Sequence, residues 1–251
     1  MAPVSMRVSP LPSWIIDEPF AHRGLHDEAA GIPENTLAAF DAAIASGYAI
    51  ELDVRQMGDG ALVVFHDSNL RRACGIDGRL SDLAWGDVKQ TGIFGTEHQM
   101  PLFDEVLALT AGRVPLLVEV KKDSGHHDIE RALHDTLSRY HGPFAVQSFS
   151  PTALRWFRKH AIGAALGLVA GPLTGEDIPA LKKFSSRSLL GALVSRPDFI
   201  NYDLRAMPDA WIGVISRLAS LPVICWTVRT DEDKQKAERL GLNYVFENVR
   251  P

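Results

Sequence analysis

The sequence predicts an α/β protein built as a (β/α)8 barrel, the TIM-barrel class, and two observations lead to that prediction. Short apolar segments alternate with helical patterns along the chain, and eight such segments are present. Repeated strand–helix alternation is typical of parallel sheets, and eight repeats favour closure into a barrel. The length of 251 residues also suits a single barrel domain.

Each predicted strand is a short segment that is dense in apolar residues, as expected of parallel strands buried on both faces. The eight segments are residues 19–22, 49–54, 114–120, 144–147, 164–169, 199–202, 222–227 and 244–247.

Helix-capping residues mark the starts of several predicted helices between these strands. Asn35 or Thr36 can cap a helix that follows the first strand. Ser150 can cap another, because the proline after it suits the first helical position. Thr230, with Asp233 three residues later, resembles a capping box.

One segment departs from the alternation and predicts a β-hairpin. Residues 54–57 and 61–66 flank the turn sequence Gly58-Asp59-Gly60, which favours an antiparallel return strand beside the second barrel strand. If the turn centres near Asp59, His66 lies opposite Leu52. The hairpin therefore extends the second strand and brings His66 beside its acidic residues.

Residues 68–100 contain five glycines and no clear periodicity, so we expect a short loop-rich insertion there. No internal repeat, low-complexity tract or linker indicates a second domain. We therefore expect residues 1–251 to form one catalytic (β/α)8 domain that contains this insertion.

Composition narrows the classes of partner. The formal net charge of −5 provides no basic field for nucleic acid or an anionic membrane. No secretory signal is recognised at the start, and the longest uncharged stretch, residues 161–175, is too short for a membrane span. Two cysteines are too few for a disulfide scaffold. We expect a cytoplasmic protein without a stable membrane anchor that acts on a small molecule.

The string Glu51-Leu52-Asp53 places two carboxylates on one face of the second predicted strand, because side chains two apart on a strand share a face. Near the C-terminal end of a barrel strand, that face lines the pocket. Two close carboxylates repel each other unless a cation or a proton intervenes, and oxygen ligands suit Mg²⁺ or Ca²⁺. Taken alone, the pair could also be salt-bridged acids at a strand end.

Three further strand ends carry side chains with related chemistry. Glu119 and Lys121 share one face at the end of the third predicted strand, where an internal ion pair is the simpler alternative. His22 and Arg23 end the first strand and could transfer a proton and bind a phosphate. His66 ends the hairpin, where a structural histidine is the simpler alternative. Together, carboxylates for a divalent ion, basic groups for a phosphate and paired histidines supply what phosphodiester cleavage needs.

These strings also resemble a known family, the glycerophosphodiester phosphodiesterases, in sequence and in order along the chain. The resemblance covers about residues 19–251 and rests on Ala21-His22-Arg23-Gly24, Pro33-Glu34-Asn35-Thr36, Glu51-Leu52-Asp53-Val54, Phe65-His66-Asp67, Glu119-Val120-Lys121, Gln147-Ser148-Phe149 and Cys225-Trp226-Thr227-Val228. Each string is weak alone, but the ordered set is specific.

The resemblance implies a TIM barrel that hydrolyses deacylated phospholipids, such as glycerophosphocholine or glycerophosphoethanolamine, to glycerol 3-phosphate and an alcohol. It implies one divalent cofactor ion, Mg²⁺ or Ca²⁺. Carried over by position, the family pattern assigns the following roles: His22 and His66 as the general acid/base pair, with Arg23 beside them in the catalytic set; Glu51, Asp53 and Glu119 as metal ligands; and Arg23, Lys121, Gln147, Phe149 and Trp226 as phosphate- or substrate-binding residues.

Two other functions are compatible with the same residues. Relatives on this scaffold cleave lysophospholipids in the manner of a phospholipase D, which requires an apolar groove for an acyl chain. A non-catalytic module that binds a metal or a phosphodiester is the second alternative. Turnover of glycerophosphocholine compared with lysophosphatidylcholine separates the two enzymes, and binding without turnover identifies the module.

Overall fold

The computed structural model describes residues 11–122, 128–172 and 189–251. The strands of these ranges begin and end within two residues of the predicted barrel segments, and one further strand completes the hairpin. They are β1 (Phe20–His22), β2 (Ala49–Gln56), β3 (Leu62–Val64), β4 (Leu116–Val120), β5 (Phe144–Ser148), β6 (Ala165–Ala170), β7 (Phe199–Asp203), β8 (Val223–Val228) and β9 (Asn243–Phe246).

Strand order confirms the predicted fold class. The sheet runs β1-β9-β8-β7-β6-β5-β4-β2-β3, and β1 also pairs with β2. Eight strands therefore follow one another in a cycle with β3 outside it, as in a (β/α)8 barrel. By its internal contacts the chain divides into two compact units, residues 21–144 and residues 1–20 with 145–251.

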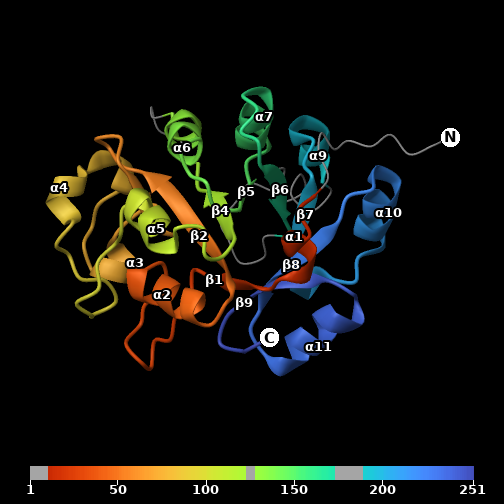
Figure 1. Ribbon diagram of the computed structural model, residues 1–251, viewed down its shortest axis with the longest axis horizontal. Coiled ribbons are helices and arrows are strands. Elements are labelled where there is room, and N and C mark those ends of the chain that lie inside the picture. The colour runs from red at the N-terminus through yellow and green to blue at the C-terminus, as the bar shows by residue number, and fades with distance from the viewer. Residues whose placement is uncertain (1–10, 123–127, 173–188) are drawn as a thin grey trace. The chain divides into compact units, whose positions relative to one another are not determined.

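In the described part of the unit of residues 21–144, the helices outside the insertion are α2 (Leu37–Ala45), α5 (Phe103–Thr110) and α6 (Ile129–Leu137). Helices α2 and α5 lie side by side next to β2 (Figure 1). Of the two candidate caps, Thr36 begins α2, because its hydroxyl accepts a hydrogen bond from the Ala39 amide at 3.2 Å. The side chain of Asn35 points instead to Asp53, at 2.9 Å.

The predicted hairpin is present, with a shorter return strand than expected. The Met57 amide donates to the Ala61 carbonyl at 2.9 Å across the turn, where Gly60 has a φ of +91° that favours glycine. Val54 pairs with Val64, the register that the turn predicts. The return strand ends at Val64, two residues before its predicted end, because the chain bends at His66.

Residues 68–100 form the predicted loop-rich insertion, with three short helical segments: α3 (Arg71–Cys74), the 3₁₀ helix η1 (Leu80–Asp82) and α4 (Trp85–Val88). The insertion shares an apolar cluster with the hairpin. That cluster contains Met57, Val63, Phe65, Leu70, Ala73, Leu80, Val88, Ile93 and Met100. Its burial anchors the insertion on β3 and fixes the position of α3.

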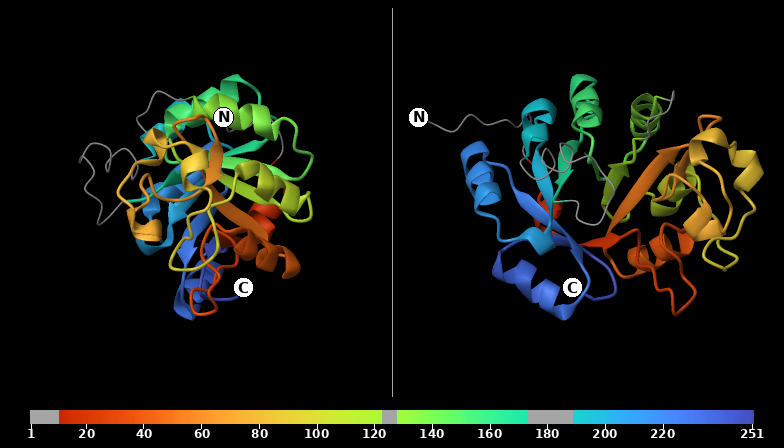
Figure 2. Two further views of the ribbon diagram at one scale, coloured as in Figure 1. Left: turned by 90° about the vertical axis from the view of Figure 1, so that its left-hand side faces the viewer. Right: turned by 180° about the vertical axis from the view of Figure 1, so that it is seen from behind.

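The other unit contains α1 (Trp14–Asp17), α7 (Pro151–Lys159), α9 (Leu190–Ser195), the 3₁₀ helix η2 (Leu204–Ala206), α10 (Ala210–Ala219) and α11 (Asp231–Arg239). Helices α7 and α9 lie side by side, and α7 also packs on β6 (Figure 2). The predicted caps Ser150 and Thr230 accept hydrogen bonds from the Ala153 and Asp233 amides at 3.3 and 3.1 Å.

Within the described ranges, no helix combines the length and hydropathy that a membrane crossing requires. Cys74 and Cys225 are both free thiols, as the cysteine count predicts.

Candidate active site

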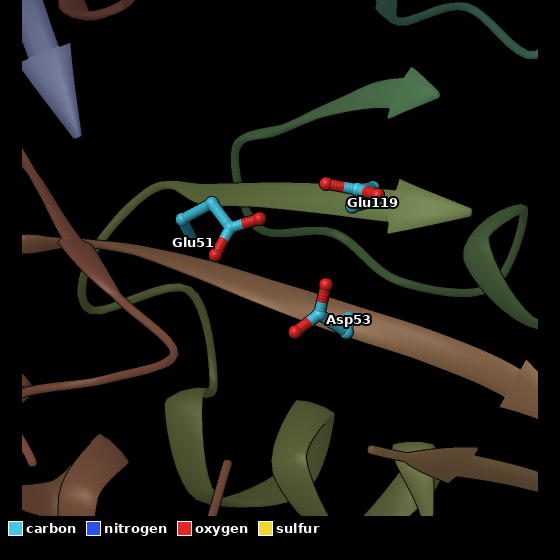
Figure 3. A group of neighbouring side chains, drawn as sticks. All are labelled: Glu51, Asp53 and Glu119. Carbon is cyan, nitrogen blue, oxygen red and sulfur yellow. The ribbon is translucent and has the colours of Figure 1, made fainter. Parts of the chain in front are cut away.

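Three carboxylates converge on neighbouring strands of the 21–144 unit. Glu51 and Asp53 lie on β2 and Glu119 lies on β4, and their side chains point toward one another (Figure 3). One oxygen of each lies within 4.8 Å of the others, and all three residues are buried. The predicted metal ligands are therefore brought together in one group.

Strand register explains this convergence. β2 and β4 are parallel, and Asp53 is the direct partner of Glu119. Partners on adjacent strands share a face, and Glu51 reaches the same face from two residues earlier on β2. Leu52 and Val54 alternate with them and are fully buried. The alternation that predicts a shared face thus holds in the fold.

The pKa shifts of the acidic group differ in direction. Burial, followed by repulsion from Asp53 and Glu119, raises the pKa of Glu51 well above its usual range. Burial alone would also raise the pKa of Asp53, but Lys121 and then Arg23 hold it well below its usual range. Glu51 is therefore a buried acid short of positive charge, and a divalent cation among these oxygens would supply that charge. The donor set fits a hard metal ion.

Two basic side chains adjoin the carboxylates. The Lys121 Nζ lies 3.0 Å from Asp53 Oδ1 and 2.5 Å from Glu119 Oε1. The Arg23 Nε lies 3.3 Å from Asp53 Oδ2, and the Arg23 amide donates to Glu51 Oε2 at 3.3 Å. Burial lowers the pKa of Lys121, but Asp53 and Glu119 outweigh it and raise that pKa, so the amine stays charged. When all three carboxylates are ionised, the two cations leave them with one excess negative charge.

Both predicted acid/base histidines lie in the same unit as the carboxylates. The His22 Nε2 is 4.0 Å from Glu51 Oε2. At the bend after β3, the Arg55 Nε donates to the His66 carbonyl at 2.7 Å, and the His66 Nδ1 lies 2.7 Å from Asp67 Oδ1. The Phe65 amide, one residue before His66, donates to the Asp53 carbonyl at 2.9 Å, so His66 directly follows a contact with the acidic strand.

The structure adds three residues that sequence reasoning did not assign to the site. Asn35 donates from Nδ2 to Asp53 Oδ2 at 2.9 Å, and its backbone has a φ of +56°. Glu34 accepts hydrogen bonds from Arg23 and from Arg72. The string Pro33-Glu34-Asn35-Thr36 signalled the first two, whereas nothing in the irregular segment that follows His66 signalled Arg72.

The remaining predicted substrate residues belong to the other unit, where they are connected to one another. The Gln147 Oε1 accepts from Asn201 Nδ2 at 2.9 Å, and Trp226 Nε1 donates to the Asn201 carbonyl at 3.2 Å. The Phe149 and Trp226 rings meet edge to face, with centroids 5.6 Å apart. Three distant segments of sequence thus form one aromatic and amide cluster.

Comparison with known proteins identifies the family of this chain. Residues 22–249 match the model of the glycerophosphoryl diester phosphodiesterase family. A glycerophosphodiester phosphodiesterase of Caldanaerobacter subterraneus is 34% identical over 238 residues, covering 90% of this chain and 91% of its own.

Solved structures share the fold. An Oleispira antarctica phosphodiesterase, in complex with the product sn-glycerol-3-phosphate, has a TM-score of 0.73 at 22% identity, covering 92% of this chain and 93% of its own. A Thermotoga maritima glycerophosphodiester phosphodiesterase has a TM-score of 0.67 at 24% identity, covering 91% of this chain and 92% of its own.

Fold, acidic group and sequence matches together define an enzyme that hydrolyses phosphoric diesters. The chain belongs to the glycerophosphoryl diester phosphodiesterase family.

Proposed function

We propose that this chain hydrolyses glycerophosphodiesters, which are deacylated phospholipids, to glycerol 3-phosphate and an alcohol. The observation that carries the proposal is the convergence of three buried carboxylates, with two cations and His22 next to them. The Oleispira antarctica relative was solved with sn-glycerol-3-phosphate, the product expected here. Residues 1–251 would act as one catalytic domain.

Glu51, Asp53 and Glu119 would hold one divalent ion, and their oxygens suit Mg²⁺ or Ca²⁺. When bound, such an ion polarises a phosphoryl oxygen and lowers the pKa of a nearby hydroxyl. Arg23 and Lys121 would bind the phosphate, since both are charged and adjoin the carboxylates. With the ion and a phosphodiester monoanion in place, the charges of the site balance.

His22 and His66 would move the two protons that the reaction requires. Asp67 is ionised because hydrogen bonds from His66 and Arg72 outweigh its burial and hold its pKa below the usual range. An ionised carboxylate only accepts, so the His66 Nδ1 carries the hydrogen and Nε2 is left to exchange a proton with substrate. His22, 4.0 Å from Glu51, would serve the opposite oxygen of the phosphodiester.

Gln147, Phe149 and Trp226 would contact the glycerol or the leaving alcohol. Their cluster combines an amide with two aromatic rings, groups whose chemistry suits a small polyol.

The test is a metal add-back assay. Chelator-stripped protein is given glycerophosphocholine with Mg²⁺, Ca²⁺ or Mn²⁺, and glycerol 3-phosphate is measured. We expect metal-restored release and a kcat at least about a hundredfold lower in His22→Ala and in His66→Ala. His134→Ala is the matched control, because His134 also lies beside the aspartate that follows it, at 3.4 Å from Asp135.

Full activity in both histidine variants would contradict the acid/base assignment. Faster turnover of lysophosphatidylcholine than of glycerophosphocholine would instead indicate an enzyme that cleaves lysophospholipids in the manner of a phospholipase D. Binding of both compounds without turnover would contradict it altogether.

A further inference from the structure

Arg72, on helix α3 of the insertion, contacts two carboxylates that come from separate parts of the chain. Its Nε donates to Asp67 Oδ2 at 2.7 Å, and its Nη2 donates to Asp67 Oδ1 at 3.2 Å. The same Nη2 donates to Glu34 Oε1 at 2.6 Å. A single guanidinium therefore joins the segment after β3 to the segment before α2, in a planar geometry that no other side chain can reproduce.

Each of these carboxylates also contacts a residue of the proposed catalytic set. Asp67 Oδ1 lies 2.7 Å from the His66 Nδ1. Both oxygens of Glu34 accept from the Arg23 Nη1 at 2.9 Å. The contacts form one continuous path from Arg23 through Glu34, Arg72 and Asp67 to His66.

Charge keeps this path intact. Burial alone would raise the pKa of Glu34, but Arg23 and then Arg72 lower it. Asp67 behaves likewise through His66 and Arg72. Both carboxylates are therefore ionised and act only as acceptors, so they hold the imidazole and the guanidinium in one orientation.

The insertion fixes Arg72 in turn. Its guanidinium carbon lies 5.0 Å from the centre of the Phe94 ring, over the ring face. Leu70 and Ala73, on either side of Arg72, are buried in the apolar cluster that the insertion shares with the hairpin. Arg72 thus extends from a packed backbone, although its side chain is 45% exposed.

We propose that Arg72 is a positioning residue that holds His66 in its working tautomer and orientation and holds Arg23 in place for the phosphate. The insertion of residues 68–100 then has a role in catalysis, although it provides no residue of the proposed catalytic set. The inference rests on the proposed function of His66 and Arg23.

The first test compares two arginines of the same helix. Arg72→Gln should lower kcat roughly tenfold to a hundredfold, by analogy with the loss seen when a group that orients a metal-bound histidine is removed. KM should change less than kcat, because the oriented imidazole acts on the transition state. Arg71→Gln is the matched control: Arg71 is 79% exposed, its partner Asp77 is 84% exposed, and we expect less than a twofold change.

Rescue separates positioning from loss of fold. Arg72→Lys should recover only part of kcat, because one ammonium cannot contact both carboxylates in a planar fork. In Arg72→Ala, added guanidinium ion should raise kcat several-fold, since the exposed side chain leaves its place open to solvent. Equal kcat in Arg72→Gln and Arg71→Gln, or a loss that guanidinium and lysine both fail to reverse, would overturn the proposal.

A measurement without substrate distinguishes this proposal from the proposed function. In protein labelled with ¹⁵N-histidine, the His66 nitrogen shifts should show the Nδ1–H tautomer, and Arg72→Gln should convert them to a tautomer mixture. If the wild-type chain releases no glycerol 3-phosphate but the tautomer changes, the proposed function fails while Arg72 still positions His66. If the chain is active and the tautomer and kcat are both unchanged in Arg72→Gln, the positioning role is wrong.

Discussion

At the scale of single residues, Glu51 has the least favourable environment of the three carboxylates. Its raised pKa means that the folded chain favours the protonated form. The stability it contributes is present at pH values below its usual range and is lost as the pH rises through the raised pKa. Asp53 has the opposite effect. Because its pKa is lowered, the stability that it contributes is present at pH values above the usual range of that pKa, and it is lost as the pH falls. Near neutral pH, therefore, the metal-free fold contains one unfavourable carboxylate.

We predict that Glu51→Gln raises the Tm of the metal-free chain at pH 8 and abolishes the rise caused by metal. The amide removes charge repulsion and desolvation at a buried position, and each kcal/mol corresponds to about 2–4 °C in a chain of this size. Thermal unfolding in chelator and in excess Mg²⁺ or Ca²⁺ measures both effects. Activity should fall at the same time.

Glu130→Gln is the matched control for this prediction. Glu130 is also buried, but Lys122 contacts it directly, so removing its charge leaves a cation without its partner. Its metal-free Tm should fall or stay level while that of Glu51→Gln rises. A fall of equal size in both variants would show that Glu51 is a stabilising charge, contrary to the prediction.

The sequence predicted those site residues whose positions follow from strand geometry. Glu51, Asp53 and Glu119 lie on one face because alternation and parallel register place them there. His66 was placed beside the acidic residues from the hairpin register alone. Arg72 could not be placed, since its contacts depend on how an irregular segment folds back onto Glu34, 38 residues earlier. Periodicity does not determine such a contact.

At the scale of elements, the insertion and the hairpin depend on each other, and Gly58 sits at their contact. Its amide donates to the Leu83 carbonyl at 2.8 Å. A Cβ at this position would lie 2.8 Å from the Ser81 carbonyl oxygen and 3.0 Å from that of Leu83. These atoms are backbone, so they can move away only if the segment around η1 shifts.

We predict that Gly58→Ala destabilises the chain by about 1–3 kcal/mol, the usual cost of overpacking. Amides of residues 80–83 should exchange faster with solvent, and kcat should fall because the displaced cluster also anchors α3 and Arg72. Hydrogen exchange measured by mass spectrometry, denaturant unfolding and the glycerophosphocholine assay report the three effects.

Gly78→Ala is the control within the same segment. Its Cβ would meet only the flexible Leu83 Cδ1, at 3.4 Å, which is an ordinary contact. We expect little change in exchange or in kcat. If Gly58→Ala also left both unchanged, the insertion and hairpin would not be coupled as the packing indicates.

At the scale of the whole molecule, strand alternation and eight repeats were enough to predict the fold class, and the predicted strand ends were correct within two residues. The division into two compact units had no counterpart in the sequence, since no linker or change in composition marks residues 20–21 or 144–145. The division matters for function because all three proposed metal ligands lie in residues 21–144. Metal binding should therefore stabilise residues 21–144 against local opening more than residues 145–251.

We predict that a divalent ion at a hundred times its Kd stabilises the chain by about 2.7 kcal/mol. At about 2–4 °C for each kcal/mol, the Tm rises by roughly 5–11 °C. Hydrogen exchange should slow most in residues 49–56 and 116–120, which carry the ligands. Without the ion, repulsion between the like charges on these two strands favours their local opening. In residues 145–251, only amides that exchange through global unfolding should slow.

Asp53→Asn is the matched variant for that experiment, because it removes one ligand charge at a position of almost unchanged shape. Its metal-dependent slowing should disappear from both ligand strands together, since one ion would contact both. Slowing that persists in Asp53→Asn, or that is spread evenly over residues 21–251 in the wild-type chain, would mean that the stabilising ion binds elsewhere. In that case Glu51, Asp53 and Glu119 would be an acidic group neutralised by Arg23, Lys121 and a proton on Glu51.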